Sequence, residues 1–169
     1  FNTVPEKKVL EIYQTYQELI HKNNSVDFDD LLVLPVELFK KYPEILDKYQ
    51  EKFKYILVDE YQDTNEVQYQ FNKLLASKYR NLFVVGDANQ SIYGFRNANF
   101  RNILNFEKDF PGTKIIKLEQ NYRSTKSILN AANAIIKNNS KKYEKNLWTE
   151  KEEGKLPEYF MLIYGLLIP

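Results

Sequence analysis

Three short, largely apolar runs, separated by longer amphipathic segments, constrain this fold more than any other feature of the sequence. The runs span 55–58, 82–85 and 114–118 and are rich in residues that favour β-strands. Between them, apolar residues recur at helical spacing, from Val67 to Leu75 and from Phe100 to Phe106. The order strand–helix–strand–helix–strand predicts an α/β fold with a parallel sheet and right-handed crossovers. Strands that are apolar throughout indicate a sheet covered on both faces.

Amphipathic helices are expected on both sides of this strand region. Residues 5–22 place Val9, Tyr13, Tyr16 and Ile20 on one helical face. Residues 26–32 begin a second helix, with acids in its first turn. A third helix follows residues 121–124, with Ser124 as its expected N-cap. Its expected inner face is Ile128, Leu129, Ala132, Ile135 and Ile136.

The composition excludes several function classes. With 24 basic and 23 acidic residues among 169, the net charge of +1 gives no global argument for nucleic-acid binding, so any such site must be a local groove. The absence of Cys excludes disulfides and thiolate metal sites, and it fits a reducing cytoplasm. The apolar run 159–168 is shorter than the roughly 20 residues that a bilayer-spanning helix requires. We therefore expect a cytoplasmic location and no membrane partner.

Acidic residues follow the first two apolar runs directly. Asp59 and Glu60 follow the first run, and Gly86 and then Asp87 follow the second. The carboxyl ends of parallel strands are where α/β sheets bind ligands. Such a pair of acids suits phosphoryl transfer from ATP, because the first can hold Mg²⁺ and the second can polarise an attacking water. The amide of Gln90 can contact a terminal phosphate or that water. The alternative is a solvated strand end with surface acids and an amide that caps its own loop.

Three extended motifs resemble those of one helicase family. Residues 59–65 read Asp-Glu-Tyr-Gln-Asp-Thr-Asn, residues 86–96 read Gly-Asp-Ala-Asn-Gln-Ser-Ile-Tyr-Gly-Phe-Arg, and residues 118–125 read Leu-Glu-Gln-Asn-Tyr-Arg-Ser-Thr. Their order and spacing resemble the UvrD/PcrA/Rep group of superfamily 1 DNA helicases. Residues 26–32 resemble a segment that precedes these motifs in that group. The resemblance covers roughly residues 5–158.

The resemblance implies a role in ATP hydrolysis for five residues. Asp59 is implied to bind Mg²⁺, and Glu60 to be the catalytic base. Gln90 is implied to sense the γ-phosphate and to link it to the DNA site. Tyr122 is implied to stack on the adenine, and Arg123 to act as an arginine finger on the γ-phosphate.

The resemblance also implies a single-stranded DNA site. Tyr93 and Phe95 are implied to lie along the strand, where stacking on bases is sequence-tolerant, and Arg96 is implied to approach the DNA backbone. The alternative for the two rings is packing in the core. The alternative for Arg123 is a surface ion pair with Glu119 or another acid.

The chain departs from the family at several points. It contains no Gly-x-x-x-x-Gly-Lys-Ser/Thr, the loop that cradles ATP phosphates, so we expect the isolated chain to be inactive. Phe95 stands where the family more often has Trp, and Asn97 where it usually has Gly. Residues 161–169 do not fit the family pattern. Because the chain opens without Met and ends in an apolar stretch, we expect it to be an internal piece of a longer protein.

The resemblance implies a partial RecA-like fold, of the P-loop NTPase type, with flanking helices and the start of a second motor domain. Residues 1–25 would belong to a helical inserted subdomain, residues 26–118 to the C-terminal part of the first motor domain, and residues 119–169 to the second.

The function implied is that of a fragment of an ATP-dependent 3′-to-5′ DNA helicase, of a family with roles in DNA repair. Its cofactors would be ATP and Mg²⁺, and its partners single-stranded DNA and duplex junctions. Two alternatives stay open. One is the motor part of a helicase–nuclease subunit. The other is a non-catalytic scaffolding or binding module.

Overall fold

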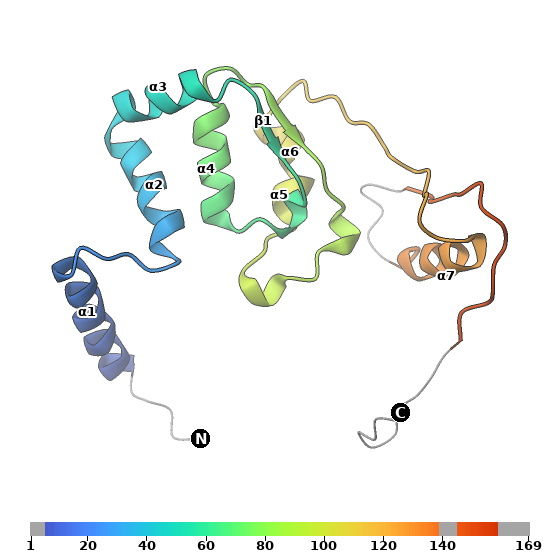
Figure 1. Ribbon diagram of the computed structural model, residues 1–169, viewed down its shortest axis with the longest axis horizontal. Coiled ribbons are helices and arrows are strands. Elements are labelled where there is room, and N and C mark those ends of the chain that lie inside the picture. The colour runs from blue at the N-terminus through green and yellow to red at the C-terminus, as the bar shows by residue number, and fades with distance from the viewer. Residues whose placement is uncertain (1–5, 139–144, 159–169) are drawn as a thin grey trace. The chain divides into compact units, whose positions relative to one another are not determined.

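The computed structural model describes residues 6–138 and 145–158, and its contacts divide the chain into two compact units (Figure 1). The first unit is Phe1–Phe106 and the second is Glu107–Pro169. The divergent segment 161–169 and the apolar run 159–168 lie outside the described residues. None of the helices in the described ranges combines the length and the apolar character that a bilayer crossing needs.

The first unit begins with three helices, α1 (Glu6–Lys22), α2 (Asp30–Lys41) and α3 (Pro43–Lys52). The first of them confirms the helix predicted over 5–22. Just before α2, the side chains of Asp27 and Asp30 each accept a hydrogen bond from the other's backbone N–H, at 2.9 and 3.2 Å. This exchange resembles a capping box and satisfies donors that a helix start leaves unpaired.

Two parallel strands follow, β1 (Ile56–Val58) and β2 (Leu82–Val84), with Ile56 opposite Leu82 and Val58 opposite Val84. The connection is α4 (Glu66–Ala76). Its first turn is closed by a capping box, in which the Asn65 side chain and the Gln68 side chain exchange hydrogen bonds with each other's backbone. The predicted strand–helix–strand order and the parallel pairing are thereby confirmed for the first two runs.

The third predicted strand is wrong, because residues 114–118 form no strand. A strand exists through backbone hydrogen bonds to a neighbouring strand, and the sheet of the described residues contains only β1 and β2. Its apolar side chains stay exposed, with Ile116 at 65% and Leu118 at 75%. The expectation that both sheet faces are covered also fails for the described residues, because Leu57 and Phe83 are 74% and 57% exposed.

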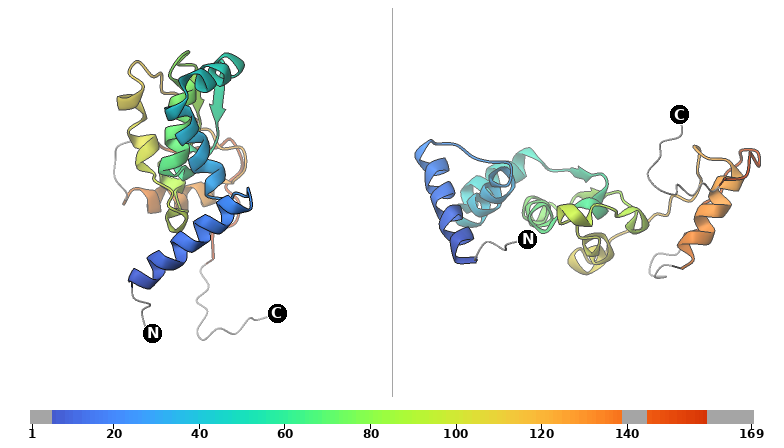
Figure 2. Two further views of the ribbon diagram at one scale, coloured as in Figure 1. Left: turned by 90° about the vertical axis from the view of Figure 1, so that its left-hand side faces the viewer. Right: turned by 90° about the horizontal axis from the view of Figure 1, so that it is seen from below.

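The core of the first unit gathers aromatic rings from neighbouring helices. Phe39 of α2 is 5% exposed, and its ring centroid lies 5.5 Å from that of Tyr49 in α3 and 5.6 Å from that of Phe71 in α4. The two additional views in Figure 2 also show α2, α3 and α4 side by side. A second ring pair, Tyr61 and Phe106, meets edge to face at 5.6 Å. These ring contacts therefore serve packing.

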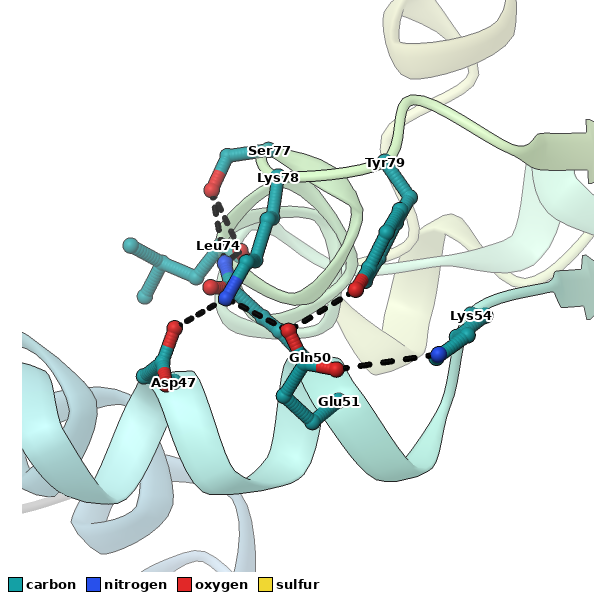
Figure 3. A network of polar contacts seen from close by, with 8 residues as sticks. All are labelled: Asp47, Gln50, Glu51, Lys54, Leu74, Ser77, Lys78 and Tyr79. Carbon is teal, nitrogen blue, oxygen red and sulfur yellow. Dashed lines mark hydrogen bonds and ion pairs between the residues drawn. The ribbon is translucent and has the colours of Figure 1, made fainter.

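A polar network joins α3 to the end of α4 (Figure 3). At its centre, the Gln50 side chain, 6% exposed, donates to the Leu74 carbonyl and to the Ser77 hydroxyl, both at 2.8 Å. Around it, Lys78 pairs with Asp47 and Glu51 at the surface. Hydrogen bonds from Lys78 and from the Tyr79 hydroxyl hold the pKa of Glu51 below its usual value. Because surface ion pairs contribute little, the buried amide is the stronger link between the helices.

The second unit contains α7 (Lys126–Ile136), and its N-cap is Thr125 rather than the predicted Ser124. No side chain caps this helix. Instead, the first N–H groups of α7 donate to the backbone carbonyls of Glu152 and Glu153, at 3.2 and 3.0 Å. This long-range pairing satisfies the free donors of the helix start, and local sequence does not reveal it.

Candidate functional site

The two acids after β1 stand at the end of the strand pair, as predicted. Backbone pairing continues past the strands, since the Val85 N–H donates to the Val58 carbonyl and the Tyr61 N–H to the Val85 carbonyl, both at 2.9 Å. Asp59 and Glu60 lie in this turn and are exposed. Glu60 has φ 50 and ψ 42, the left-handed region that non-glycine residues rarely adopt. The Asp59 carboxylate accepts the Glu60 N–H at 2.9 Å through one of its two oxygens.

Gln62 connects this turn to the end of β2 and was not among the predicted site residues. Its side chain is buried, in a residue 1% exposed. The amide nitrogen donates to Oε2 of Glu60 at 2.7 Å, and the amide oxygen accepts the Asp87 N–H at 2.9 Å. The feature of the sequence that could have identified Gln62 is its position between the acids of the 59–65 motif.

Asp87, which follows the end of β2, holds the side chain of Gln90 by a hydrogen bond. The Asp87 carboxylate accepts the Asn89 N–H at 3.1 Å and the Gln90 amide at 2.8 Å. A short 3₁₀ turn, η2 (Ala88–Gln90), results. Gln90 itself is exposed. Its amide therefore sits near the strand ends and is held by the neighbouring acid.

A divalent ion at this site would need ligands beyond the protein. The described residues contain no group of three or more His, Cys, Asp and Glu side chains placed to hold a metal. The exposed carboxylate of Asp59 does fit Mg²⁺, which retains several waters and usually takes only one or two protein carboxylates together with substrate phosphates. The residues present fit a nucleotide-bound Mg²⁺ rather than a permanent metal centre.

A cavity of about 790 Å³ reaches Asp59 and Glu60 at one end. Most of its described lining is apolar and comes from α2, α4 and the ring cluster around Phe39. No Lys or Arg is among these lining residues. The described lining of this cavity therefore offers no cationic side chain to a phosphate.

The loop after β2 carries an exposed aromatic cluster around η3 (Gly94–Arg96). The rings of Tyr93 and Phe95 lie 5.9 Å apart and are 39% and 78% exposed. The Arg96 guanidinium carbon lies 5.5 Å from both ring centroids, within cation–π range. Neither ring is buried among the described residues. Asn97 has φ 61, in the left-handed region that Gly adopts readily and Asn adopts more often than other residues.

Buried amide contacts anchor this loop to the acidic motif. Asn102, 5% exposed, donates to both the carbonyl and the hydroxyl oxygen of Thr64 at 3.1 Å. The Thr64 hydroxyl donates to the Tyr61 carbonyl at 2.7 Å, and the Asn99 N–H donates to the Thr64 carbonyl at 2.9 Å. The sequence analysis missed Thr64 and Asn102, since their partners lie far apart in the chain.

Tyr122 and Arg123 belong to the second unit, in a turn organised by Asn121. The Asn121 side-chain oxygen accepts the N–H groups of Arg123 and Ser124, at 2.9 and 2.7 Å. Tyr122 is 76% exposed, and its hydroxyl donates to the Gln120 side chain at 2.8 Å.

The Arg123 side chain is exposed and forms no ion pair within residues 6–138 and 145–158. Glu119, the acid considered as its surface partner, instead accepts the Asn146 N–H at 3.0 Å. The backbone carbonyl of Arg123 accepts Lys151 Nζ at 2.9 Å. Its guanidinium is thus presented on a turn whose backbone is held by other residues.

Two family models match the chain. The UvrD/REP helicase N-terminal domain matches residues 1–111, and the UvrD-like helicase C-terminal domain matches residues 116–162. The chain is similar to curated proteins named ATP-dependent DNA helicase PcrA. Identity is 56% over 152 residues with the protein of Staphylococcus aureus (strain Mu50), which covers 90% of this chain and 21% of that relative.

Two further relatives with the same name agree. The protein of Bacillus subtilis (strain 168) is 55% identical over 155 residues, which covers 92% of this chain and 21% of the relative. The protein of Staphylococcus epidermidis is 53% identical over 159 residues, which covers 94% of this chain and 22% of the relative. The chain thus spans about a fifth of the length of these curated relatives.

Proposed function

This chain belongs to the UvrD/Rep helicase family, and we propose that it carries part of the ATP and single-stranded DNA machinery of a 3′-to-5′ DNA helicase. The single observation that carries the proposal is the junction of the two strand ends. There a buried Gln62 holds Glu60 beside an exposed Asp59 and, through the Asp87 backbone, a loop with exposed rings. The residues proposed for nucleotide chemistry and those proposed for base stacking thus lie close together in the sequence. Unwinding of a tailed duplex by the full-length protein tests this function.

We propose that the strand-end residues act on a bound nucleotide. ATP with Mg²⁺ would supply the phosphoryl group and the charge that neutralises its oxygens. Asp59 would hold Mg²⁺ through water, and Glu60 would take the proton of the attacking water. Gln90 would contact the γ-phosphate. Arg123 would stabilise the charge on that phosphate, with Tyr122 stacked on the adenine.

We propose the domain assignment that the family resemblance implies. Residues 1–25 would belong to an inserted helical subdomain, residues 26–118 to the first motor domain and residues 119–169 to the second. A RecA-like architecture, a cytoplasmic location and binding to duplex junctions are parts of the same proposal. The chain contains no Gly-x-x-x-x-Gly-Lys-Ser/Thr, so residues 1–169 alone are expected to hydrolyse no ATP.

The DNA half of the proposal predicts that Tyr93→Ala in the full-length protein weakens single-stranded DNA binding by about 1–3 kcal/mol, the usual contribution of a base–aromatic stack. The exposed ring offers a face for stacking, and its loss removes no phosphate contact. The slope of affinity against salt concentration should therefore stay the same. Fluorescence anisotropy titrations with a labelled single strand at several salt concentrations measure both quantities.

Two companion variants make the Tyr93 test specific. Tyr13→Ala removes an exposed ring, 58% accessible, from α1 and should leave DNA affinity unchanged. Arg96→Met should weaken binding and lower the salt slope by about 1 if its guanidinium reaches a phosphate. Unchanged affinity in Tyr93→Ala, together with a lowered melting temperature, would show that the ring serves only packing.

A further inference from the structure

The Gln62 side chain hydrogen-bonds both to the proposed base and to the end of the second strand. We propose that Gln62 is a positioning residue, which holds the Glu60 carboxylate in its working orientation and ties it to the loop after β2. The inference rests on the proposed function, because it takes Glu60 as the base. Its observations are the burial of Gln62 and its hydrogen bonds at 2.7 Å to Glu60 Oε2 and 2.9 Å from the Asp87 N–H.

A carboxamide fits this position chemically, because it can donate on one side and accept on the other. The Asp87 N–H can only donate, so it fixes the amide oxygen of Gln62 on that side. The amide nitrogen then faces Glu60, with a longer contact of 3.4 Å to Asp63 Oδ2. An ionised Glu side chain here would offer no donor to Glu60, and an apolar side chain would remove the acceptor that Gln62 provides to the Asp87 N–H. Both ends of the amide are therefore used.

Glu60 needs such a restraint because its own surroundings give it little. It is exposed and lies in the left-handed region, with φ 50. A long exposed side chain samples several rotamers, whereas a base must point at one water. The bond from Gln62 is the side-chain contact that removes this freedom within the described residues. Residues that orient a reacting group in this way typically matter by about 10–100-fold.

The backbone at Gly86 leaves room for the Gln62 amide. A Cβ built on Gly86 would lie 2.5 Å from Gln62 Oε1 and 2.8 Å from the Ile103 side chain. The Gln62 amide and the Ile103 side chain would both have to move, and the Tyr61 backbone N would lie at 3.1 Å. Gly86→Ala therefore displaces the Gln62 amide without altering its chemistry, and this variant gives a second way to disturb the same contact.

The test uses the full-length protein with Gln62→Met, which keeps the side-chain length and removes the amide. Steady-state ATP hydrolysis with saturating single-stranded DNA should show kcat lowered by about 10–100-fold. The KM for ATP and the DNA affinity should change by less than about twofold, because Gln62 contacts the base and not the ligands. The matched control is Gln70→Met, since Gln70 also donates its amide to a carboxylate, that of Glu66 at 2.9 Å on α4. This control should hydrolyse ATP like the wild type.

A double-mutant cycle separates positioning from general support of the fold. If Gln62 acts through Glu60, Gln62→Met should cause almost no further loss in single-turnover rate once Glu60→Gln is present. The same fold-loss in both backgrounds would overturn the inference, and so would an unchanged kcat in Gln62→Met. If Gln62→Met does not fold, Gly86→Ala takes its place. The same fall in kcat is expected, and an unchanged kcat would overturn the inference.

Failure of the proposed function gives a different result. If Glu60→Gln alone hydrolyses ATP like the wild type, Glu60 is not the base, and the proposed function loses its catalytic assignment. If Glu60→Gln is inactive while the Gln62 and Gly86 variants retain full kcat, only the positioning role of Gln62 is overturned.

Discussion

Glu60→Gln in the full-length protein is expected to abolish ATP turnover while ATP still binds with Mg²⁺. The substitution removes the group that takes a proton from the attacking water, but it keeps the shape of the side chain and an oxygen that can accept from Gln62. Loss of a positioned general base typically lowers a rate by about 10²–10⁴-fold. Single-turnover hydrolysis with radiolabelled ATP measures the rate, and equilibrium binding of a fluorescent ATP analogue measures affinity.

Substitutions of two other acids serve as comparisons for Glu60→Gln. Asp59→Asn should weaken the Mg²⁺-dependent part of nucleotide binding, since the exposed Asp59 carboxylate is the proposed metal contact. Glu66→Gln changes an exposed acid of α4 and should alter neither quantity. Turnover of Glu60→Gln at the wild-type rate would mean that the roles of the two strand-end acids are assigned wrongly.

Arg123→Ala is expected to lower ATP turnover by orders of magnitude, since an arginine finger contributes about 10³–10⁵ in rate. The turn should survive the change, because Asn121 holds the backbone N–H groups of residues 123 and 124, and Lys151 holds the carbonyl of 123. The variant should therefore fold and still bind single-stranded DNA. Arg123→Lys should rescue little, because a point charge does not reproduce the planar fork of the guanidinium.

An exposed arginine elsewhere provides the control for this prediction. Arg101→Ala, in α5 (Arg101–Leu104), removes a guanidinium from the first unit and should leave turnover unchanged. Steady-state hydrolysis with saturating DNA compares the variants. An Arg123→Ala protein that keeps more than about a tenth of the wild-type rate lies far outside the range for such a finger. That result would remove Arg123 from the nucleotide site.

Local patterns in the sequence predicted the elements whose causes are local. The helix over 5–22, the first two strands and the family itself all follow from spacing and motifs that a single pass along the chain reveals. The pattern of acids that follow apolar runs correctly predicted that Asp59 and Glu60 lie at the end of β1. The site roles of these residues remain predictions.

The features that sequence reasoning missed depend on contacts between distant residues. Gln62 joins the two strand ends because parallel pairing brings the Asp87 N–H within 2.9 Å of its amide oxygen. The start of α7 needs no side-chain cap, because carbonyls of residues 152–153 serve its free N–H groups. Residues 114–118 have the composition of a strand but do not join the sheet of the described residues, so composition alone predicted a strand that did not form.

The proposed helicase activity is tested most directly by unwinding of a labelled duplex with a single-stranded tail, using the full-length protein with ATP and Mg²⁺. A duplex with a 3′ tail should separate, whereas a duplex with a 5′ tail or with blunt ends, and any duplex without ATP, should stay paired. Unwinding of the 5′-tailed duplex alone would contradict the proposed polarity. Binding of the tailed duplex with neither unwinding nor ATP hydrolysis would contradict the proposed function and identify the protein as a non-catalytic binding module.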